Sequence, residues 1–203
     1  ENRRSAVRKI RGVAYALTAL ADSALVHALI TRNRADSLFR EAEDSATILI
    51  ASSVSSPELP ALVEHLRQRL ELTPALLIHA VCSGRLEFFT AAMVNLSGLD
   101  DRKVRAILAT GRPHALKALF QSIGLSGDVV DVFIEATLMW RRAARSQLPE
   151  AAASVSAELL SHFRDVSGSE TLFELLHAVR KLSIAEERQK ARYYAQALAV
   201  EAA

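Results

Sequence analysis

The chain has 203 residues, of which 50% are hydrophobic and 24% are charged. This length is enough to bury roughly 70% of the surface that the unfolded chain exposes, and the composition excludes a wholly disordered protein. The formal net charge of +2 is well below the bias that would by itself indicate a nucleic-acid-binding protein. The single cysteine excludes an intramolecular disulfide and fits a reducing compartment, so we expect a cytoplasmic protein.

Residues 5–31 are predicted to form one long, mostly apolar helix with a basic beginning. This order of basic and then apolar residues imitates a signal peptide. We reject that interpretation, because Asp22 and His27 interrupt the apolar stretch and a membrane-spanning helix needs about 20 predominantly apolar residues. The chain begins at Glu1 rather than at a methionine, so we expect it to be a piece of a longer protein.

A second helix is predicted to start at Asp36 or Ser37 and to continue to about Ser53. The polar cluster at residues 31–34 is expected to end the first helix, and residues 52–60 form the next break.

The stretch from Leu72 to Ala136 repeats itself at a period of about 27 residues. One helical face occurs three times at spacing i, i+3, i+4, as Leu77, Ala80 and Val81, then Val104, Ile107 and Leu108, then Val130, Phe133 and Ile134. A second face occurs twice, as Phe89, Ala92, Met93 and Leu96, then Leu116, Leu119, Phe120 and Ile123. A weaker upstream copy of the second face consists of Val63, Leu66 and Leu70. Because such helix pairs bury their apolar faces only when the next pair stacks on them, the repeat predicts a stacked helical array.

Capping residues recur with the same period. Helices are expected to start at Thr73-Pro74, Asp100-Asp101 and Ser126-Gly127-Asp128, where hydroxyls or carboxylates can accept from backbone N–H groups. Helices are expected to end just before four glycines that adopt positive φ, namely Gly84, Gly98, Gly111 and Gly124.

Four helices are predicted in the remainder of the chain. The first two extend from Asp128 to about Arg145 and from Pro149 to about Arg164. Two serine–glutamate pairs with the spacing of a capping box, Ser167 with Glu170 and Ser183 with Glu186, then predict helices over residues 169–182 and 184–200. The last helix has few aliphatic residues, so it is expected to cap the array or to pack on a partner chain. The possibility that this helix forms a homo-oligomer stays open.

These elements predict an all-α fold of about ten helices, centred on HEAT-like αα repeats, in a single domain over residues 1–203. Its parts are N-terminal helices with a degenerate repeat (1–71), the clearest repeats (72–145) and C-terminal helices (149–203). The run from Leu72 to Gly84, with Phe88-Phe89 and Leu96-Ser97-Gly98-Leu99, resembles a bacterial family of HEAT-like helical repeat proteins that is catalogued only as a domain of unknown function. That resemblance implies the fold and no activity.

Few residue patterns suggest chemistry. His79 and Cys82 could face one metal ion, and Glu174 with His177 has the spacing used in di-iron bundles, but each pair lacks the further ligands that a site needs. The chain has no Gly-x-Ser-x-Gly turn and no phosphate-binding glycine loop. Trp140 is expected to pack rather than to stack on a base. We therefore predict no catalytic, metal or cofactor site, and no enzyme activity.

The remaining candidates are four arginines: Arg85, Arg112, Arg141 and Arg142. Arg85 and Arg112 hold the same repeat position after Gly84 and Gly111, and a local role at helix C-termini is expected for them. The function predicted for the chain is a non-catalytic protein–protein interaction module. The alternative is a nucleic-acid binder in which these arginines contact phosphates from the concave face of the array.

Overall fold

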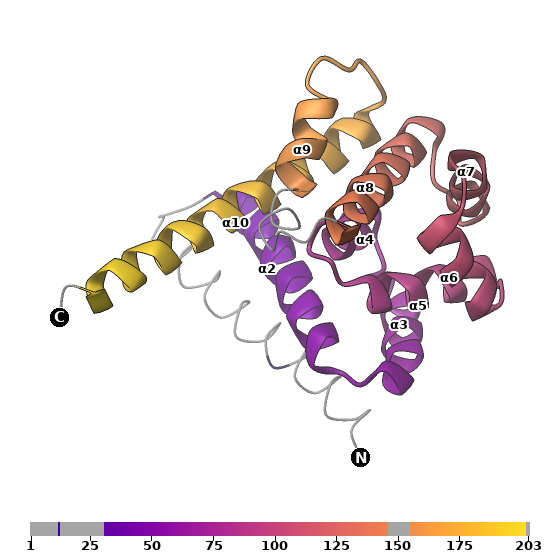
Figure 1. Ribbon diagram of the computed structural model, residues 1–203, viewed down its shortest axis with the longest axis horizontal. Helices are drawn as coiled ribbons and strands as arrows, with labels where there is room; N and C mark the ends of the chain where they lie inside the picture. Colours follow the sequence, from indigo (N-terminus) through magenta and orange to yellow (C-terminus); the bar gives the residue numbers. More distant parts are fainter. Residues whose placement is uncertain (1–11, 13–30, 146–154, 202–203) are drawn as a thin grey trace. The chain divides into compact units, whose positions relative to one another are not determined.

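The computed structural model describes residue 12, residues 31–145 and residues 155–201. All regular structure in these residues is helical, which confirms the all-α class (Figure 1). The helices are α2 (Arg32–Ser53), η1 (Ser56–Glu58), α3 (Leu59–Gln68), α4 (Pro74–Cys82), α5 (Leu86–Ser97), α6 (Asp101–Thr110), α7 (Pro113–Ser122), α8 (Gly127–Arg145), α9 (Val155–His162) and α10 (Glu170–Glu201). The helix expected over residues 5–31 and the helix start expected at Pro149 lie outside the described residues.

The helix starts follow the predicted period. Helices α3, α5 and α7 begin 27 residues apart, at Leu59, Leu86 and Pro113. Helices α4, α6 and α8 begin 27 and then 26 residues apart, at Pro74, Asp101 and Gly127. Two interleaved sets of helices therefore share one sequence period.

The chain divides into two compact units, one made of residues 1–80 and 85–104 and the other of residues 81–84 and 105–203. In the first unit α3 packs on α5, and both contribute fully buried side chains: Leu62, Val63 and Leu66 from α3, and Phe89, Ala92 and Met93 from α5. In the second unit α8 packs on α7, α9 and α10. The Phe120 and Phe133 rings meet there with centroids 5.6 Å apart. The faces predicted for α4, α5, α7 and α8 are thus largely buried, whereas on α6 only Val104 is buried and Ile107 and Leu108 are half-buried.

Two of the three predicted helix starts have the expected caps. Thr73 Oγ1 accepts from the Leu76 N–H at 3.2 Å, and Asp100 Oδ1 accepts from the Arg102 N–H at 2.9 Å. At the third start the Ser126 hydroxyl instead donates to the Asp128 carboxylate, which accepts from the Val129 N–H.

Several helix boundaries differ from the prediction. Helix α2 begins at Arg32, four residues before the predicted start at Asp36, and the cluster contains no glycine or proline that would keep residues 32–34 out of its first turn. Helix α10 is continuous where two helices were predicted, because its interior has no glycine or proline and Ser183 is buried on one of its faces. Its N-cap is Ser169, whose hydroxyl accepts from the Leu172 N–H, and not Ser167.

The expected positive φ occurs at Gly84, Gly98 and Gly124, but not at Gly111. Arg112, the residue after Gly111, has to be extended because it precedes Pro113, so the chain leaves α6 without a left-handed turn. Leu70 has φ +58° although it is not a glycine. It was expected in the core, yet it lies beyond the end of α3 with 88% of its surface exposed.

Leu70→Gly is expected to stabilise the protein by about 0.5 to 1 kcal/mol. The Leu70 N–H donates to Arg67 O and the Glu71 N–H donates to Leu66 O. The same pattern of two hydrogen bonds occurs after α7, where the left-handed residue is Gly124. The left-handed conformation costs a residue with a Cβ about 1 to 2 kcal/mol, and glycine avoids this cost. The greater conformational freedom of glycine in the unfolded chain offsets part of the gain. Urea unfolding followed by circular dichroism measures the change, and a destabilisation would show that the Leu70 side chain has a packing role.

Candidate functional site

Arg141 binds the end of another helix through all three of its nitrogens. Nε and Nη2 donate to the carbonyl oxygens of Leu108 and Ile107, both at 2.6 Å, and Nη1 donates to the Gly111 carbonyl at 2.8 Å. These carbonyls belong to the last turn of α6 and to the residue after it, where a helix leaves acceptors without intrahelical donors. Arg141 of α8 therefore caps the C-terminus of α6.

Gly111 is required by the close backbone geometry at this junction. Its N–H donates to Ile107 O at 2.9 Å, and a Cβ at this position would lie only 2.5 Å from the same oxygen. The helix-capping role expected of the local Arg112 is thus performed by Arg141, an arginine 29 residues further along the chain.

The other three candidate arginines are on the surface. Arg142 forms an ion pair with Glu158 of α9 at 3.1 Å, and both side chains are largely exposed. Such a pair contributes at most about 1 kcal/mol. Arg85 and Arg112 precede α5 and α7 with exposed side chains, and neither guanidinium has an acceptor among the described residues. Arg85 and Arg112 belong to different units.

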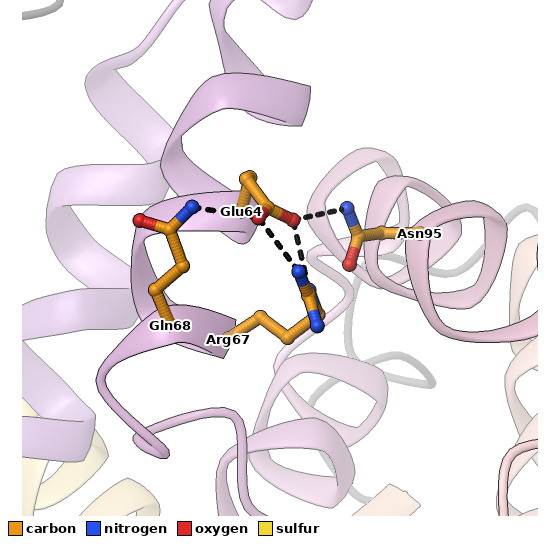
Figure 2. A network of polar contacts seen from close by, with 4 residues as sticks. All are labelled: Glu64, Arg67, Gln68 and Asn95. Atoms are coloured by element: carbon orange, nitrogen blue, oxygen red, sulfur yellow. Dashed lines mark hydrogen bonds and ion pairs between the residues drawn. The ribbon is translucent and has the colours of Figure 1, made fainter.

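Glu64 of α3 is the centre of a polar network that the sequence analysis missed (Figure 2). Its carboxylate accepts from Arg67 at 2.7 and 2.8 Å, from Gln68 at 2.8 Å and from Asn95 of α5 at 3.0 Å. The i+3 and i+4 spacing of Arg67 and Gln68 was visible in the sequence, but Asn95 is 31 residues away. The hydrogen bond to Arg67, followed by those to Asn95 and Gln68, lowers the pKa of Glu64 to about 2.

This network predicts an acid-dependent stability difference between the wild type and Glu64→Gln. The folded pKa of Glu64 lies below its ordinary 4.5, so its contribution is complete above about pH 4.5 and is lost as the pH falls toward 2. The stability advantage of the wild type should therefore be largest near neutral pH and shrink below pH 4.5. Urea unfolding at several pH values between 7 and 2.5 measures it; a difference that does not vary with pH would contradict the prediction.

Asp128 connects the starts of two helices in the second unit. Its carboxylate accepts from the Ser169 N–H at 2.8 Å, next to the first turn of α10, and from the Val129 N–H at 3.0 Å in its own helix α8. The hydroxyl of Ser169, then its N–H, and more weakly Ser126 and Val129, lower the pKa of Asp128 to about 2. A carboxylate between two helix N-termini is favoured by the partial positive charge of both.

The candidate metal ligands do not gather. Within the described residues, no group of three or more His, Cys, Asp or Glu side chains could hold a metal ion. Cys82 is 3% exposed, and Glu174 and His177 lie exposed on α10. Burial lowers the pKa of His79 to about 4. Trp140 packs near the end of α4, because a Cβ on Gly84 would lie 3.4 Å from its Nε1.

Cys82 is expected to resist thiol reagents while the protein is folded. Burial, and secondarily the charge of Glu186, raise the pKa of its thiol to about 12, so almost no thiolate exists at neutral pH. An absorbance assay with a disulfide reagent should show no labelling within minutes in buffer and complete labelling in concentrated urea. Stoichiometric labelling of the native protein, or one equivalent of bound metal, would contradict this expectation.

Helix α10 has an exposed face, which we call the α10 stripe. Leu172, Leu175 and Val179 on the opposite face are buried. The stripe consists of exposed residues at alternating intervals of four and three: Phe173, His177, Arg180, Ile184, Glu187, Ala191 and Tyr194. The helical spacing was visible in the sequence, but the exposure of Phe173 (53%) and Ile184 (42%) was not.

The described structure is that of an all-helical protein whose polar networks join its own helices. A family model for an uncharacterised protein conserved in bacteria (DUF2336) matches residues 10–172, so the chain belongs to that family. No curated protein and no solved structure matched the chain. Among the helices described, none has the length and apolarity needed to cross a membrane.

Proposed function

We propose that this chain is a non-catalytic protein–protein interaction module built from HEAT-like helical pairs, acting in the cytoplasm. The repeat arrangement is supported by the constant interval between helix starts and by the packing of α3 on α5, since like helices of successive pairs stack on each other in such arrays. The one free cysteine suits a cytoplasmic location.

The observation that carries the proposal is the α10 stripe. It holds three large exposed side chains, Phe173, Ile184 and Tyr194, on a long helix whose opposite face is buried from Leu172 to Ser183. Exposed apolar groups arranged in register mark surfaces that bind other proteins.

A non-catalytic role is supported by how the polar groups are used. Arg141, Glu64 and Asp128 have the densest hydrogen bonding of the candidate groups, and each of them binds groups of its own unit. These contacts connect helices of the protein itself, so no substrate is needed to explain why the three side chains are placed there.

The alternative is a nucleic-acid binder that uses arginines on a concave face. The exposed guanidinium groups of Arg85 and Arg112 support it, and Arg142 is also on the surface. Arg141 supports it less, because its guanidinium already donates to three backbone carbonyls.

The two functions are separated by one pair of experiments. Affinity capture from a lysate of the native cell, followed by mass spectrometry, should recover a specific protein in amounts comparable to the bait. Duplex and single-stranded DNA should bind no tighter than about 10 µM at physiological salt, the non-specific range. Tight, salt-sensitive DNA binding that disappears in Arg85→Gln, Arg112→Gln with the fold intact would favour the alternative.

A further inference from the structure

Leu70 combines a left-handed backbone with an almost fully exposed side chain. Its φ is +58°, and 88% of its surface is exposed. It lies eleven residues after the start of α3 (59 to 70), as Gly124 lies eleven residues after the start of α7 (113 to 124). The two turns also have the same hydrogen bonds. At this position of the repeat, α3 is therefore followed by a large apolar side chain where α7 is followed by the glycine that the turn favours.

The leucine lowers the stability of the turn, and its side chain adds little in return. The left-handed conformation disfavours a residue with a Cβ, and an apolar side chain that stays in water contributes no burial. Exposed leucines are common in proteins, so exposure by itself indicates nothing. A backbone outlier without a compensating contact is instead typical of functional positions. Leu70 therefore has the properties of an anchor, by which we mean an apolar side chain that a partner buries.

Charged groups surround Leu70. Its two neighbours, Arg69 and Glu71, form an ion pair with each other, and the preceding arginine of α3, Arg67, is likewise bound to a carboxylate. Glu43 of α2 is close enough to both neighbours that its pKa, raised first by burial, is raised further by the charge of Glu71 and lowered by that of Arg69. Since the two arginines are paired, Glu43 gives the described surroundings of Leu70 a net negative charge.

We propose that Leu70 anchors a protein–protein contact by entering an apolar pocket of a partner that is bordered by lysine or arginine. An apolar centre with a polar border of complementary charge is the common arrangement of such contacts. The inference rests on the proposed interaction function, and it assigns to that function a surface of the first unit in addition to the α10 stripe.

Three other occupants match these groups less well. A two-fold contact with a second copy of the chain would bring the Glu43 carboxylates of both copies to the same interface, where they repel each other. Nucleic-acid phosphates are repelled by the same carboxylate and leave Leu70 without an apolar partner. An anionic lipid surface is repelled as well, and one leucine side chain buries too little apolar area to hold a protein on a membrane.

The first experiment places an aliphatic amino acid with a photoreactive diazirine group at position 70 of the full chain in the native cell. Irradiation should link position 70 to a protein, with a yield at least about tenfold above that from the same amino acid at Leu49, an exposed position of α2. The linked segment should contain apolar residues with lysine or arginine nearby. A yield no greater than at Leu49, or a link to a second copy, to nucleic acid or to lipid, would overturn the proposal.

The second experiment measures binding of the purified partner by isothermal titration calorimetry. Leu70→Gly retains the turn and removes the whole side chain, so it should weaken binding at least about tenfold without lowering the melting temperature. Leu49→Ala is the matched control and should leave binding unchanged. Glu43→Lys, which reverses the charge at the border, should weaken binding at least about threefold.

A melting temperature of Leu70→Gly below that of the wild type would give the leucine a structural role and overturn the proposal. Unchanged binding in Leu70→Gly or in Glu43→Lys would contradict it too. A lysate protein captured equally by the wild type and by Leu70→Gly would remove the anchor but retain the interaction module, with the α10 stripe as its surface. If neither chain captured a specific protein, both this inference and the proposed function would be wrong.

Discussion

Arg141→Ala is expected to lower the free energy of unfolding by about 2 to 4 kcal/mol. The change removes three hydrogen bonds from a cation to the carbonyls of Ile107, Leu108 and Gly111. Net contributions of hydrogen bonds to charged groups are about 1.5 to 3 kcal/mol and are not additive when the bonds share one side chain. The last turn of α6 should fray as a result, and urea unfolding followed by circular dichroism measures the loss.

The neighbouring arginine provides a matched control. Arg142→Ala removes the same side chain from the next position of α8, but among the described residues its partner is the exposed Glu158 alone, so the loss should stay below about 1 kcal/mol. Arg141→Lys should recover only part of the loss, because an ammonium group cannot reproduce the fork that reaches three carbonyls. Equal losses for the two alanine variants would show that the contact with α6 contributes little to stability.

Leu119→Ala is expected to cost about 2 to 5 kcal/mol. Leu119 lies on the buried face of α7, which packs on α8, and is 2% exposed. Its truncation removes apolar contact area and leaves a cavity that neighbouring side chains fill only partly. Denaturant unfolding provides the measurement, with a thermal melt as a second observable.

Leu49→Ala makes the same chemical change at an exposed site on α2 and should alter stability by no more than about 0.5 kcal/mol. If Leu119→Ala cost less than about 1 kcal/mol, the face assigned to the repeat would be wrong. If both changes cost the same, burial would not be what determines the effect.

The candidate site shows where inference from local sequence ends. The capping role expected for Arg85 and Arg112 was chemically reasonable, but the residue that caps α6 is Arg141, which approaches from α8. Glu64 and Asn95, and Asp128 and Ser169, likewise meet across 31 and 41 residues of sequence. Helical spacing relates only residues three or four apart, so no pattern in the chain indicated these partners.

The sequence by itself determined the helices and their period, because their causes are local. Apolar spacing assigned the buried faces of α5, α7 and α8, Thr73 and Asp100 marked two helix starts, and Gly84 and Gly124 marked two ends. It also placed the chain in its family. The tertiary structure decided the rest: that Leu70 takes a left-handed turn in place of a glycine, that α10 continues through Ser183, and that Phe173 and Ile184 stay exposed. These properties depend on which helices pack together. The free energy of such packing comes from groups that are far apart in the chain, and their separation in the sequence does not indicate their distance in space.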